Sequence, residues 1–286
     1  MTTSDPTGSS DTRPREGRAS FDSGPSGPRR RALVTGASVG IGEAFAERLA
    51  RDQYDLVLVA RSRDRLEAIA KRLGESRGVS VEVLVADLAR PHDLALVEQR
   101  LREEPTFDLL VNNAGVGTYG SFAELDVERE EDEVRLNVIA PLRLTRAVLP
   151  GMLERRQGAV INVSSLAGLA PTPYNATYGA TKAFVNSFTE ALHEELRDTG
   201  VRLQLLQPGF TRTEFQERAG MNTAGVPDFA WMEPIAVVDA SLEALRRGDL
   251  VCVPGGANRA VAAFTSLLPR SLARRISGAA AKRFGG

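Results

Sequence analysis

The sequence contains few of the residues that build disulfides and metal centres. Among 286 residues there is one cysteine, Cys252, and there are two histidines, His92 and His193. A single cysteine excludes an internal disulfide and every zinc site that uses several cysteines. Two histidines also argue against a histidine-based metal centre. We therefore expect no metal site, and we expect Cys252, in an apolar run, to be a small buried side chain.

An excess of charge of one sign and long apolar runs are also missing. The 36 Lys and Arg residues balance 37 Asp and Glu residues, so no overall field steers the protein toward nucleic acid. No apolar run approaches the roughly 20 residues of a membrane-spanning helix, and the first residues lack the apolar centre of a signal peptide. A hydrophobic content of 42% is ordinary for a globular protein. We expect a soluble protein of the cytoplasm with no nucleic-acid partner.

The first 30 residues differ from the rest of the chain. They contain only three apolar residues, together with four prolines and four glycines. Such a segment cannot bury enough apolar surface to offset the entropy lost on ordering. The composition predicts a disordered tail over residues 1–30. Its arginines are reminiscent of an organelle transit peptide, but its four acidic residues argue against one.

From residue 31 onward, short apolar runs alternate with longer segments of helical period. Strands that are apolar throughout are typical of a parallel sheet buried on both faces. The pattern predicts an α/β fold, a doubly wound Rossmann-type parallel sheet of about seven strands flanked by helices, in a single domain over residues 31–256. The expected strands are 32–35, 55–60, 79–86, 108–111, 159–163, 201–206 and 250–253, and the expected helices are 40–52, 62–74, 91–103, 126–156, 176–199 and 234–247.

A glycine-rich turn follows the first expected strand and leads into the first expected helix. It places Gly36, Gly40 and Gly42 in the spacing Gly-x3-Gly-x-Gly. Glycines allow a tight turn and a close approach of the backbone to a pyrophosphate, and a helix N-terminus offers free N–H groups to that anion. The spacing differs from the more common Gly-x-Gly-x-x-Gly, but its position between strand and helix predicts a dinucleotide site.

The residues after the second expected strand distinguish NADP from NAD. An NAD site carries Asp or Glu there to accept a hydrogen bond from the ribose 2′-hydroxyl. In this sequence Arg61 follows the strand, and no carboxylate stands at its end. A carboxylate repels a 2′-phosphate, whereas an arginine pairs with it, so the sequence favours NADP. The alternative is that Arg61 and Arg63 are solvated residues at a helix start, where the helix dipole disfavours cations.

Tyr178 and Lys182 lie four residues apart in an expected helix and therefore on one face of it. A phenol has a pKa of about 10, and a cation about 4 Å away can lower it by about three units at an effective dielectric of about 20. Ser165 ends an expected strand, where its hydroxyl can donate to a carbonyl oxygen that becomes an alkoxide. Tyr174 is a competing acid without such a lysine. The alternatives are a half-exposed tyrosine beside a surface lysine and, for Ser164 and Ser165, plain turn chemistry.

Taken in order, these motifs resemble those of the short-chain dehydrogenase/reductase family of NAD(P)-dependent oxidoreductases. The resemblance covers about residues 31–256 and implies a Rossmann-type fold with hydride transfer between a nicotinamide cofactor and a carbonyl or alcohol. The matching elements are the glycine turn after Thr35, Asp87-Leu88, Asn112-Asn113-Ala114-Gly115, Asn137, Ser165, Tyr178 with Lys182, and Pro208-Gly209.

The resemblance implies four catalytic residues, Tyr178, Ser165, Lys182 and Asn137. Tyr178 resembles the general acid that protonates the carbonyl oxygen, and Ser165 the residue that orients that oxygen. Lys182 resembles the residue that lowers the tyrosine pKa and holds ribose hydroxyls, and Asn137 the residue that anchors a water in a proton relay. Pro141 has no N–H to donate to the Asn137 carbonyl, which leaves that carbonyl available to a water. The alternative is a proline-kinked helix with no functional role.

The resemblance also implies how NADP(H) is held. Asp87 resembles the adenine contact, and Asn113 lies where the family lines the cofactor and stabilises the sheet. The segment 208–213 resembles the loop that holds the nicotinamide end, although Thr211 stands where the family often has Ile or Val. The expected cofactor-binding residues are Gly36, Ser38, Gly40, Ile41, Gly42, Arg61, Asp87, Leu88, Asn113, Ala114, Gly115, Tyr178, Lys182, Pro208, Gly209 and Thr213.

Residues 210–233 form a long segment between the sixth strand and the next helix. Long segments that carry apolar residues beside a site often act as lids, and an apolar lid suggests an apolar or acyl substrate. The alternative is a surface flap that covers the core. The apolar residues concerned are Phe215, Met221, Phe229, Trp231 and Met232.

The C-terminal extension, residues 257–286, is basic. Residues 250–286 contain six cations and no acid. Apolar residues recur there at near-helical spacing, as in an amphipathic helix that lies on an anionic membrane surface or binds an acidic partner. The alternative is a packing or subunit-contact helix with solvated charges. The recurring apolar residues are Leu267, Leu268, Leu272 and Ile276.

The sequence thus predicts an NADPH-dependent carbonyl reductase, reversible to an alcohol dehydrogenase, that acts on a small-molecule substrate. Within this class, a 3-oxoacyl-thioester reductase and a reductase of steroid-like ketones are alternatives. A non-catalytic NADP-sensing regulator is a different class, which the presence of all four catalytic residues argues against. A third is a protein that acts at a membrane surface through its basic extension. By resemblance, we also expect a homo-oligomer formed through the helices that hold Asn137 and Tyr178.

Overall fold

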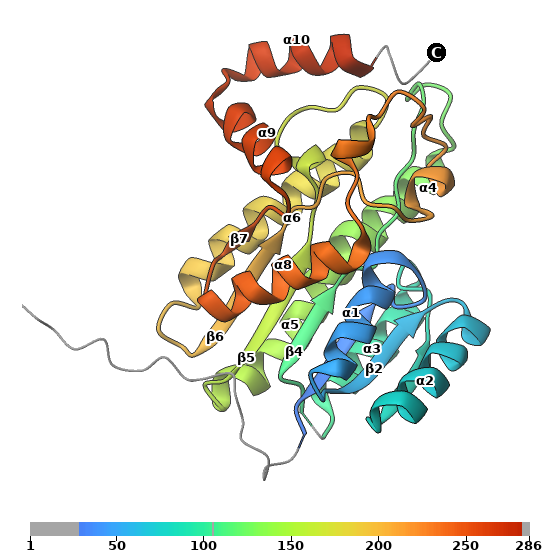
Figure 1. Cartoon of the computed structure of the whole chain (residues 1–286), viewed down its shortest axis with the longest axis vertical. Coiled ribbons are helices and arrows are strands. Elements are labelled where there is room, and N and C mark those ends of the chain that lie inside the picture. Colours follow the sequence, from blue (N-terminus) through green and yellow to red (C-terminus); the bar gives the residue numbers. More distant parts are fainter. Residues whose placement is uncertain (1–28, 105, 282–286) are drawn as a thin grey trace, which may run out of the picture.

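The computed structural model describes residues 29–104 and 106–281 (Figure 1). The expected tail lies outside these residues except for Arg29 and Arg30, and so do the last five residues of the chain. Both arginines pack on the domain. Arg29 pairs with Asp55 at 3.7 Å, and the guanidinium of Arg30 lies 4.3 Å from the centre of the Tyr54 ring. Arg29 and Arg30 therefore contact the folded domain just before its expected start at residue 31.

The seven expected strands form a parallel sheet of order β3-β2-β1-β4-β5-β6-β7. The order runs outward from β1 in both directions, so the fold is doubly wound with its switch point between β1 and β4. This confirms the expected fold class; β7 is shorter than expected. The strands are β1 (Arg31–Thr35), β2 (Asp55–Ala60), β3 (Val81–Val85), β4 (Leu109–Asn112), β5 (Gly158–Val163), β6 (Val201–Leu206) and β7 (Val251–Cys252).

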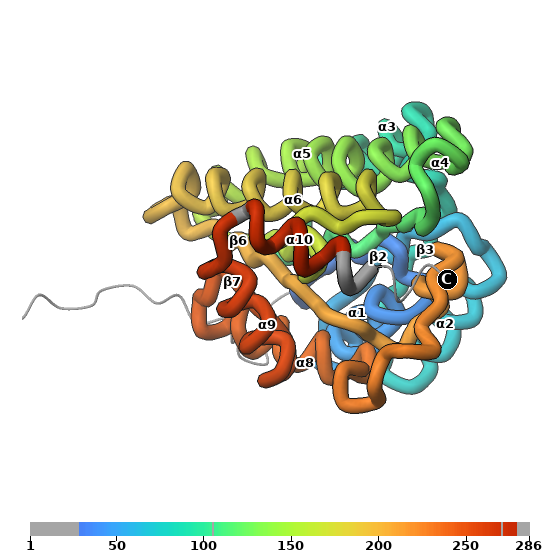
Figure 2. The backbone as a smooth tube through the Cα atoms, turned by 90° about the horizontal axis from the view of Figure 1, so that it is seen from above, coloured from blue at the N-terminus to red at the C-terminus, as the bar shows by residue number. Residues whose placement is uncertain are grey.

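Helices cover both faces of the sheet. Helices α1, α2 and α8 lie on one face and α3, α5 and α6 on the other, as Figure 2 shows from above. Helices α9 and α10 follow β7, and α10 lies beyond the carboxyl ends of the strands (Figure 1). The helices are α1 (Gly40–Arg51), α2 (Arg63–Arg77), α3 (Pro91–Arg102), α4 (Val127–Val134), α5 (Ala140–Glu154), α6 (Ala176–Glu195), α7 (Phe215–Arg218), α8 (Pro234–Arg247), α9 (Gly256–Leu267) and α10 (Arg270–Ala281).

Local sequence explains several helix ends. The side chain of Asp126 caps α4 by accepting a hydrogen bond of 3.0 Å from a backbone N–H of the first turn. Gly78, with a φ of 66°, ends α2 beyond the expected end at Gly74. Pro234 opens α8, and Gly248, with a φ of 83°, ends it.

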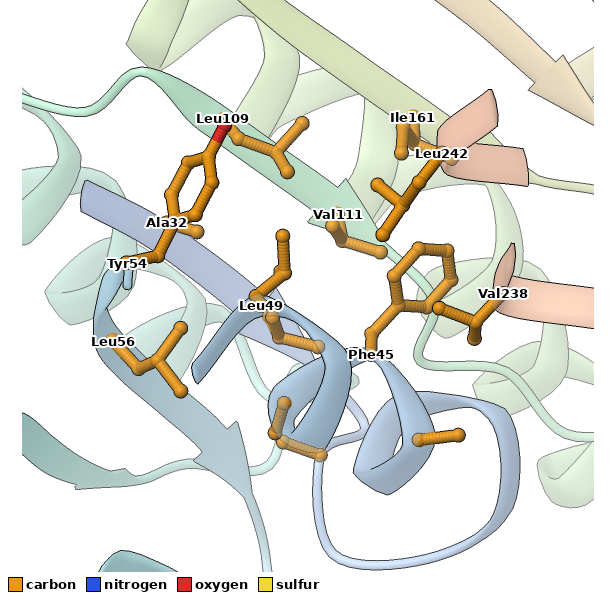
Figure 3. Packing of buried hydrophobic residues seen from close by; sticks show 14 of the residues in the cluster. Ala32, Phe45, Leu49, Tyr54, Leu56, Leu109, Val111, Ile161, Val238 and Leu242 are labelled. Carbon is orange, nitrogen blue, oxygen red and sulfur yellow. The ribbon is translucent and has the colours of Figure 1, made fainter. Parts of the chain in front are cut away.

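Two apolar clusters lie on the two faces of the sheet. The first joins α1, α2 and α8 to the sheet, and Figure 3 shows Phe45 and Leu49 of α1 beside Val238 and Leu242 of α8. The second joins α3 and α5 to the opposite face. Alternate residues of β1 belong to different clusters. The strands are therefore apolar throughout because both of their faces are covered.

The expected continuous helix over residues 126–156 contains an interruption. Helix α4 passes into a π-helical turn, Arg135–Ile139, and then into α5. Pro141 follows directly in the first turn of α5, where its missing N–H removes one bond of the regular α-helical ladder. Such π-helical turns are frequent at functional sites, and Asn137 lies in the middle of this one.

The C-terminal extension forms two helices instead of one amphipathic helix. Helix α9 ends at Leu267 and α10 begins at Arg270, because Pro269 cannot continue α9 and restricts the residue before it. The apolar residues Leu267, Leu272 and Ile276 are therefore divided between two helices. Along residues 29–104 and 106–281, no helix combines the length and the apolar character needed to span a bilayer.

Candidate active site

A cavity of about 1300 Å³ lies at the carboxyl ends of the strands. A doubly wound sheet places its ligands there, because the connections after β1 and β4 diverge at the switch point. The cavity is larger than the roughly 300–1,000 Å³ of an ordinary small-molecule site and so has room for a dinucleotide together with a second molecule. Its walls come from the segments after β1 to β6, from α6, from residues 210–233 and from α9 and α10.

The glycine turn forms part of the wall of this cavity. Gly36 and Gly40 adopt left-handed conformations, with φ of 65° and 60°. A Cβ at position 42 would lie 2.1 Å from the carbonyl oxygen of Gly36, so only glycine fits there. Helix α1 begins at Gly40, which brings its free N–H groups to the turn. The turn is therefore shaped as a backbone cradle for an anion.

Asn113 ties the end of β4 to the glycine turn. Its side-chain Nδ2 donates to the carbonyl oxygens of Thr35 at 2.9 Å and Gly36 at 3.3 Å. The hydroxyl of Thr35 accepts in return from the backbone N–H groups of Asn113 at 2.9 Å and Ala114 at 3.0 Å. These bonds hold the two sides of the switch point together, so the structure assigns Asn113 a clear part in shaping the turn.

The far end of the cavity carries the residues expected to meet the adenosine. Arg61 is exposed at the cavity wall and, within the described residues, makes no hydrogen bond or ion pair. Asp87 and Leu88 follow β3 and also line the cavity. Arg65, which the sequence analysis did not single out, lines the same wall and pairs with Glu214 at 3.1 Å. Of these two arginines, Arg61 is therefore the one without a partner among the described residues.

Ser165, Tyr178 and Lys182 meet at the opposite end. Ser165 follows β5, its Oγ accepts from the backbone N–H of Ala167 at 3.1 Å, and its side chain is hydrogen-bonded to Tyr178. Lys182 is buried, and its Nζ donates to the carbonyl oxygen of Val163 at 3.0 Å while lying 5.6 Å from the centre of the Tyr178 ring. The strand end and the helix therefore bring the three side chains of the expected catalytic set to one wall.

The electrostatics of this wall differ from the sequence-based expectation. Burial raises the pKa of Tyr178 to about 12, against an opposing effect of the Ser165 side chain, and burial lowers the pKa of Lys182 to about 8. Lys182 was expected to lower the pKa of Tyr178. In this structure the ammonium donates to the Val163 carbonyl, and the loss of water around the phenol is the largest effect on its pKa.

Asn137 supports the site from behind the cavity wall. Its Nδ2 donates to the carbonyl oxygen of Val116 at 2.8 Å and to the hydroxyl of Thr181 at 3.1 Å, and its Oδ1 accepts from the Val116 N–H at 3.0 Å. A Cβ at position 115 would lie 3.1 Å from Asn137 Oδ1 and 3.5 Å from Lys182 Nζ. The π-helical turn thus places the amide beside the lysine, and the amide fixes the segment that follows β4.

Residues 210–233, which we call the lid, close one side of the cavity. Its base is held by two backbone hydrogen bonds of 2.9 Å, from Met232 to Phe210 and from Arg212 to Met232. The ring of Phe215, at the start of α7, packs on Tyr178 with 5.4 Å between ring centres. Phe215 and Met221 line the cavity, whereas Phe229 is 80% exposed. The lid therefore presents part of its apolar surface to the cavity.

Most of the expected site residues line this cavity. Gly42 and Asn137 do not, and both act instead by supporting residues that do. Sequence reasoning missed the contact of Phe215 with Tyr178 and a buried group behind α6 that consists of Thr118, Glu130 and Glu133. Among the described residues, no set of three His, Cys, Asp or Glu side chains gathers as metal ligands would.

A family model described as "short chain dehydrogenase" matches residues 30–223. The chain belongs to this family. Its members are oxidoreductases that use a nicotinamide cofactor and act on small molecules. The matched range includes the glycine turn, Ser165, Tyr178 and Lys182, and it ends within the lid.

This chain is similar to individual curated proteins and to individual solved structures. A very-long-chain 3-oxoacyl-CoA reductase of Anas platyrhynchos is 35% identical over 220 residues, which cover 74% of this chain and 67% of the relative. A short-chain dehydrogenase from Sphingobium yanoikuyae in complex with NADPH is 41% identical, with a TM-score of 0.76 over 85% of this chain and 97% of its own. A bulky-bulky ketone specific alcohol dehydrogenase from Comamonas testosteroni is 36% identical, with a TM-score of 0.72 over 85% and 96%. In several further vertebrate relatives the match spans only 55% to 60% of the relative's length.

Proposed function

We propose that this short-chain dehydrogenase is an NADPH-dependent carbonyl reductase in which Tyr178 donates the proton to the carbonyl oxygen. The observation that carries the proposal is the joint position of Ser165, Tyr178 and Lys182 on one wall of a cavity that the glycine turn also lines. A nucleotide at the turn and a ketone beside Tyr178 would share this one space.

The residues at the turn fit a nicotinamide dinucleotide phosphate. The backbone cradle at Gly36, Gly40 and Gly42 suits the pyrophosphate, and the unpaired Arg61 is available to a 2′-phosphate. The NADPH in the solved structure of the Sphingobium relative supports this choice. When bound, the nucleotide supplies the hydride, and the protein's residues supply orientation and the proton.

The protonation states suit reduction. A pKa of about 12 keeps the proton on Tyr178 at neutral pH, and a nearby cation must offset the charge of the phenolate before that proton is given up. Lys182, with a pKa of about 8, is largely protonated at neutral pH and can offset the charge that develops on the phenol as the proton leaves. The hydroxyl of Ser165, which is hydrogen-bonded to Tyr178 in this structure, can turn to the substrate oxygen and hold it in place.

The apolar wall of the cavity favours a bulky apolar ketone or a 3-oxoacyl thioester. Phe215 and Met221 of the lid, Leu166 after β5 and Val261 of α9 all line it. The names of two relatives, a very-long-chain 3-oxoacyl-CoA reductase and a bulky-bulky ketone specific alcohol dehydrogenase, point to the same substrate classes. The test is a panel of aryl ketones, steroid ketones and 3-oxoacyl thioesters, with NADPH consumption followed by fluorescence. If at least one class is reduced, the proposal is supported. If no class leads to consumption of NADPH, the proposal is contradicted.

A peripheral membrane role is a second candidate, since α9 and α10 expose apolar side chains among cations. Phe264 is 59% exposed, Leu267 83% and Ile276 46%, and Arg259, Arg274 and Arg275 lie on the same two helices. We also propose, by resemblance to the family, that the protein forms a homo-oligomer through the helices that hold Asn137 and Tyr178, which light scattering of the purified protein tests.

A further inference from the structure

Helix α4 buries the side chains that a surface helix normally exposes. Glu130 is 7% exposed and Glu133 is completely buried, whereas Val127 and Val134 on the same helix are 61% and 38% exposed. Glu130, Glu133 and Asn137 follow one another at helical spacing and face α6, the helix of the catalytic pair. Inverted polarity of this kind opposes folding stability, so it calls for a functional reason.

The buried carboxyl groups share one hydroxyl. Thr118 Oγ1 lies 2.5 Å from Glu130 Oε1 and 3.0 Å from Glu133 Oε2. Thr177, the residue before Tyr178, donates its hydroxyl to the other oxygen of Glu130. Within the part of the chain that the structure describes, Glu133 Oε1 has no hydrogen-bond partner.

A count of hydrogens determines the charge of this group. The Thr118 hydroxyl has one hydrogen and can donate to only one carboxyl, so the second contact needs a hydrogen on a carboxyl oxygen. Glu130 already accepts from Thr177, which suits a carboxylate. Glu133 has one oxygen against Thr118 and one without a partner, which suits a neutral acid with its O–H directed at Thr118. The bonds then run from Glu133 to Thr118 to Glu130.

We propose that Glu133 is a positioning residue for the Tyr178–Lys182 pair, and that it carries the shared proton of a buried Glu133–Thr118–Glu130 chain. The titratable groups that act on it are Glu130 on its own helix and Tyr178 and Lys182 on α6. Glu133 also contacts Thr118 in the segment after β4, and the hydroxyl of Thr118 does not titrate. Loss of the proton would place a negative charge beside the catalytic pair and hold the proton on Lys182.

The pKa values agree with this arrangement. Burial, with a smaller contribution from the charge of Glu130, raises the pKa of Glu133 to about 7, and the hydrogen bonds with Thr118 and the charge of Lys182 oppose this rise. The charge of Glu133 raises the pKa of Lys182 against the larger effect of burial, and it adds to the raised pKa of Tyr178. Glu133 therefore changes charge close to neutral pH, where the lysine must remain protonated for reduction.

The shared proton can be tested without any enzymatic activity. Denaturant unfolding is measured from about pH 5 to about pH 8 for the wild type, Glu133→Gln and Glu131→Gln, an exposed control on the same helix. The folded pKa of Glu133 lies above the unfolded value of about 4.3, so the wild type loses stability as pH rises through this range. We expect the folding constant of Glu133→Gln relative to wild type to rise by up to about tenfold per pH unit and to level off above pH 7.

If the folding constant of Glu133→Gln relative to wild type does not change with pH, Glu133 does not carry the shared proton.

A second pair of variants covers the case in which Glu133→Gln does not fold. Thr118→Val removes the hydroxyl that joins the two carboxyl groups, so the pH range over which stability is lost should shift relative to Thr118→Ser, which keeps the hydroxyl. Equal pH dependence of the two Thr118 variants would again overturn the proposal.

The positioning role rests on the proposed reductase activity and has its own readout. Removal of the negative charge lowers the pKa of Lys182, so the alkaline limb of kcat/KM for ketone reduction should move to lower pH in Glu133→Gln but not in Glu131→Gln. An alkaline limb that stays in place would refute the positioning role. Absence of ketone reduction in the wild type would refute the proposed function instead, and the unfolding experiment would still decide the shared proton.

Discussion

The ring of Phe215 lies 5.4 Å from the ring of Tyr178, centre to centre, and the two planes meet at 48°. A Cβ at position 117 would lie 3.0 Å from Phe215 Cζ and 3.2 Å from Tyr178 Cδ2, so Gly117 leaves the space in which the two rings meet. The lid therefore touches the proposed acid directly. Opening and closing of the lid would change both the access of substrate and the access of water to the phenol.

Phe215→Ala should raise KM for apolar ketones by about three- to tenfold, because aromatic pairs contribute about 0.5–1.5 kcal/mol beyond the area they bury. NADPH affinity should change little. The control is Phe229→Ala in the same segment, whose side chain is exposed and does not line the cavity. Steady-state kinetics on both variants is the measurement, and an equal effect of the two substitutions would show that the lid does not contact the substrate.

Arg61→Asp should weaken NADPH by about 10- to 100-fold, the worth of a hydrogen bond between charged groups, and should strengthen NADH. The control is Arg63→Asp, which stands two residues on and pairs with Glu67 at 3.3 Å outside the cavity. Titration of nucleotide fluorescence with both cofactors gives the two affinities. An unchanged NADPH to NADH ratio in Arg61→Asp would exclude Arg61 as the 2′-phosphate ligand.

Gly42→Ala should abolish nucleotide binding and destabilise the fold by about 1–3 kcal/mol, since the new Cβ would lie 2.1 Å from the Gly36 carbonyl oxygen. Gly278→Ala is the control, because a Cβ there has no atom within 4 Å. Calorimetric melting should show a drop of about 2–4 °C per kcal/mol for Gly42→Ala alone. If Gly42→Ala keeps full NADPH affinity, the glycine turn does not bind the pyrophosphate.

Leu267→Glu should reduce binding to vesicles that contain anionic lipid, if α9 and α10 lie on a membrane surface. Leu267 is 83% exposed, so the substitution leaves the core unchanged. The control is Phe229→Glu, an equally exposed apolar residue in the lid. Sedimentation with vesicles of anionic and of zwitterionic lipid is the measurement. If the wild-type protein sediments with neither kind of vesicle, the proposed peripheral membrane role is contradicted.

The fold could be predicted from the sequence because it depends on runs that are apolar on both faces and on glycine and proline at the ends of elements. Pro141 signalled a break in the hydrogen-bond ladder at Asn137, but its local effect did not show that the break takes the form of a π-helical turn. The break at Pro269 carried a local signal, since proline ends helices, but the repeat of leucines across it was the stronger pattern.

The meeting of Ser165, Tyr178 and Lys182 on one wall was also predictable, because they occur in a fixed order at strand and helix positions. Their ionisation was not, because the pKa of Tyr178 depends on its burial and on a carboxyl group of another helix. Glu133 lies in an acidic stretch of sequence that is typical of a solvated surface. Only the packing of α4 on α6 shows that its side chain is buried.

The most direct test of the proposed reaction is Tyr178→Phe, assayed for ketone reduction and for NADPH binding on the same preparation. Removal of one hydroxyl takes away the proton donor and leaves the glycine turn and Arg61 unchanged. We predict a loss of turnover of at least about 10²- to 10⁴-fold with NADPH affinity within about threefold of wild type. Turnover within about tenfold of wild type would show that another group donates the proton and would contradict the assignment of Tyr178.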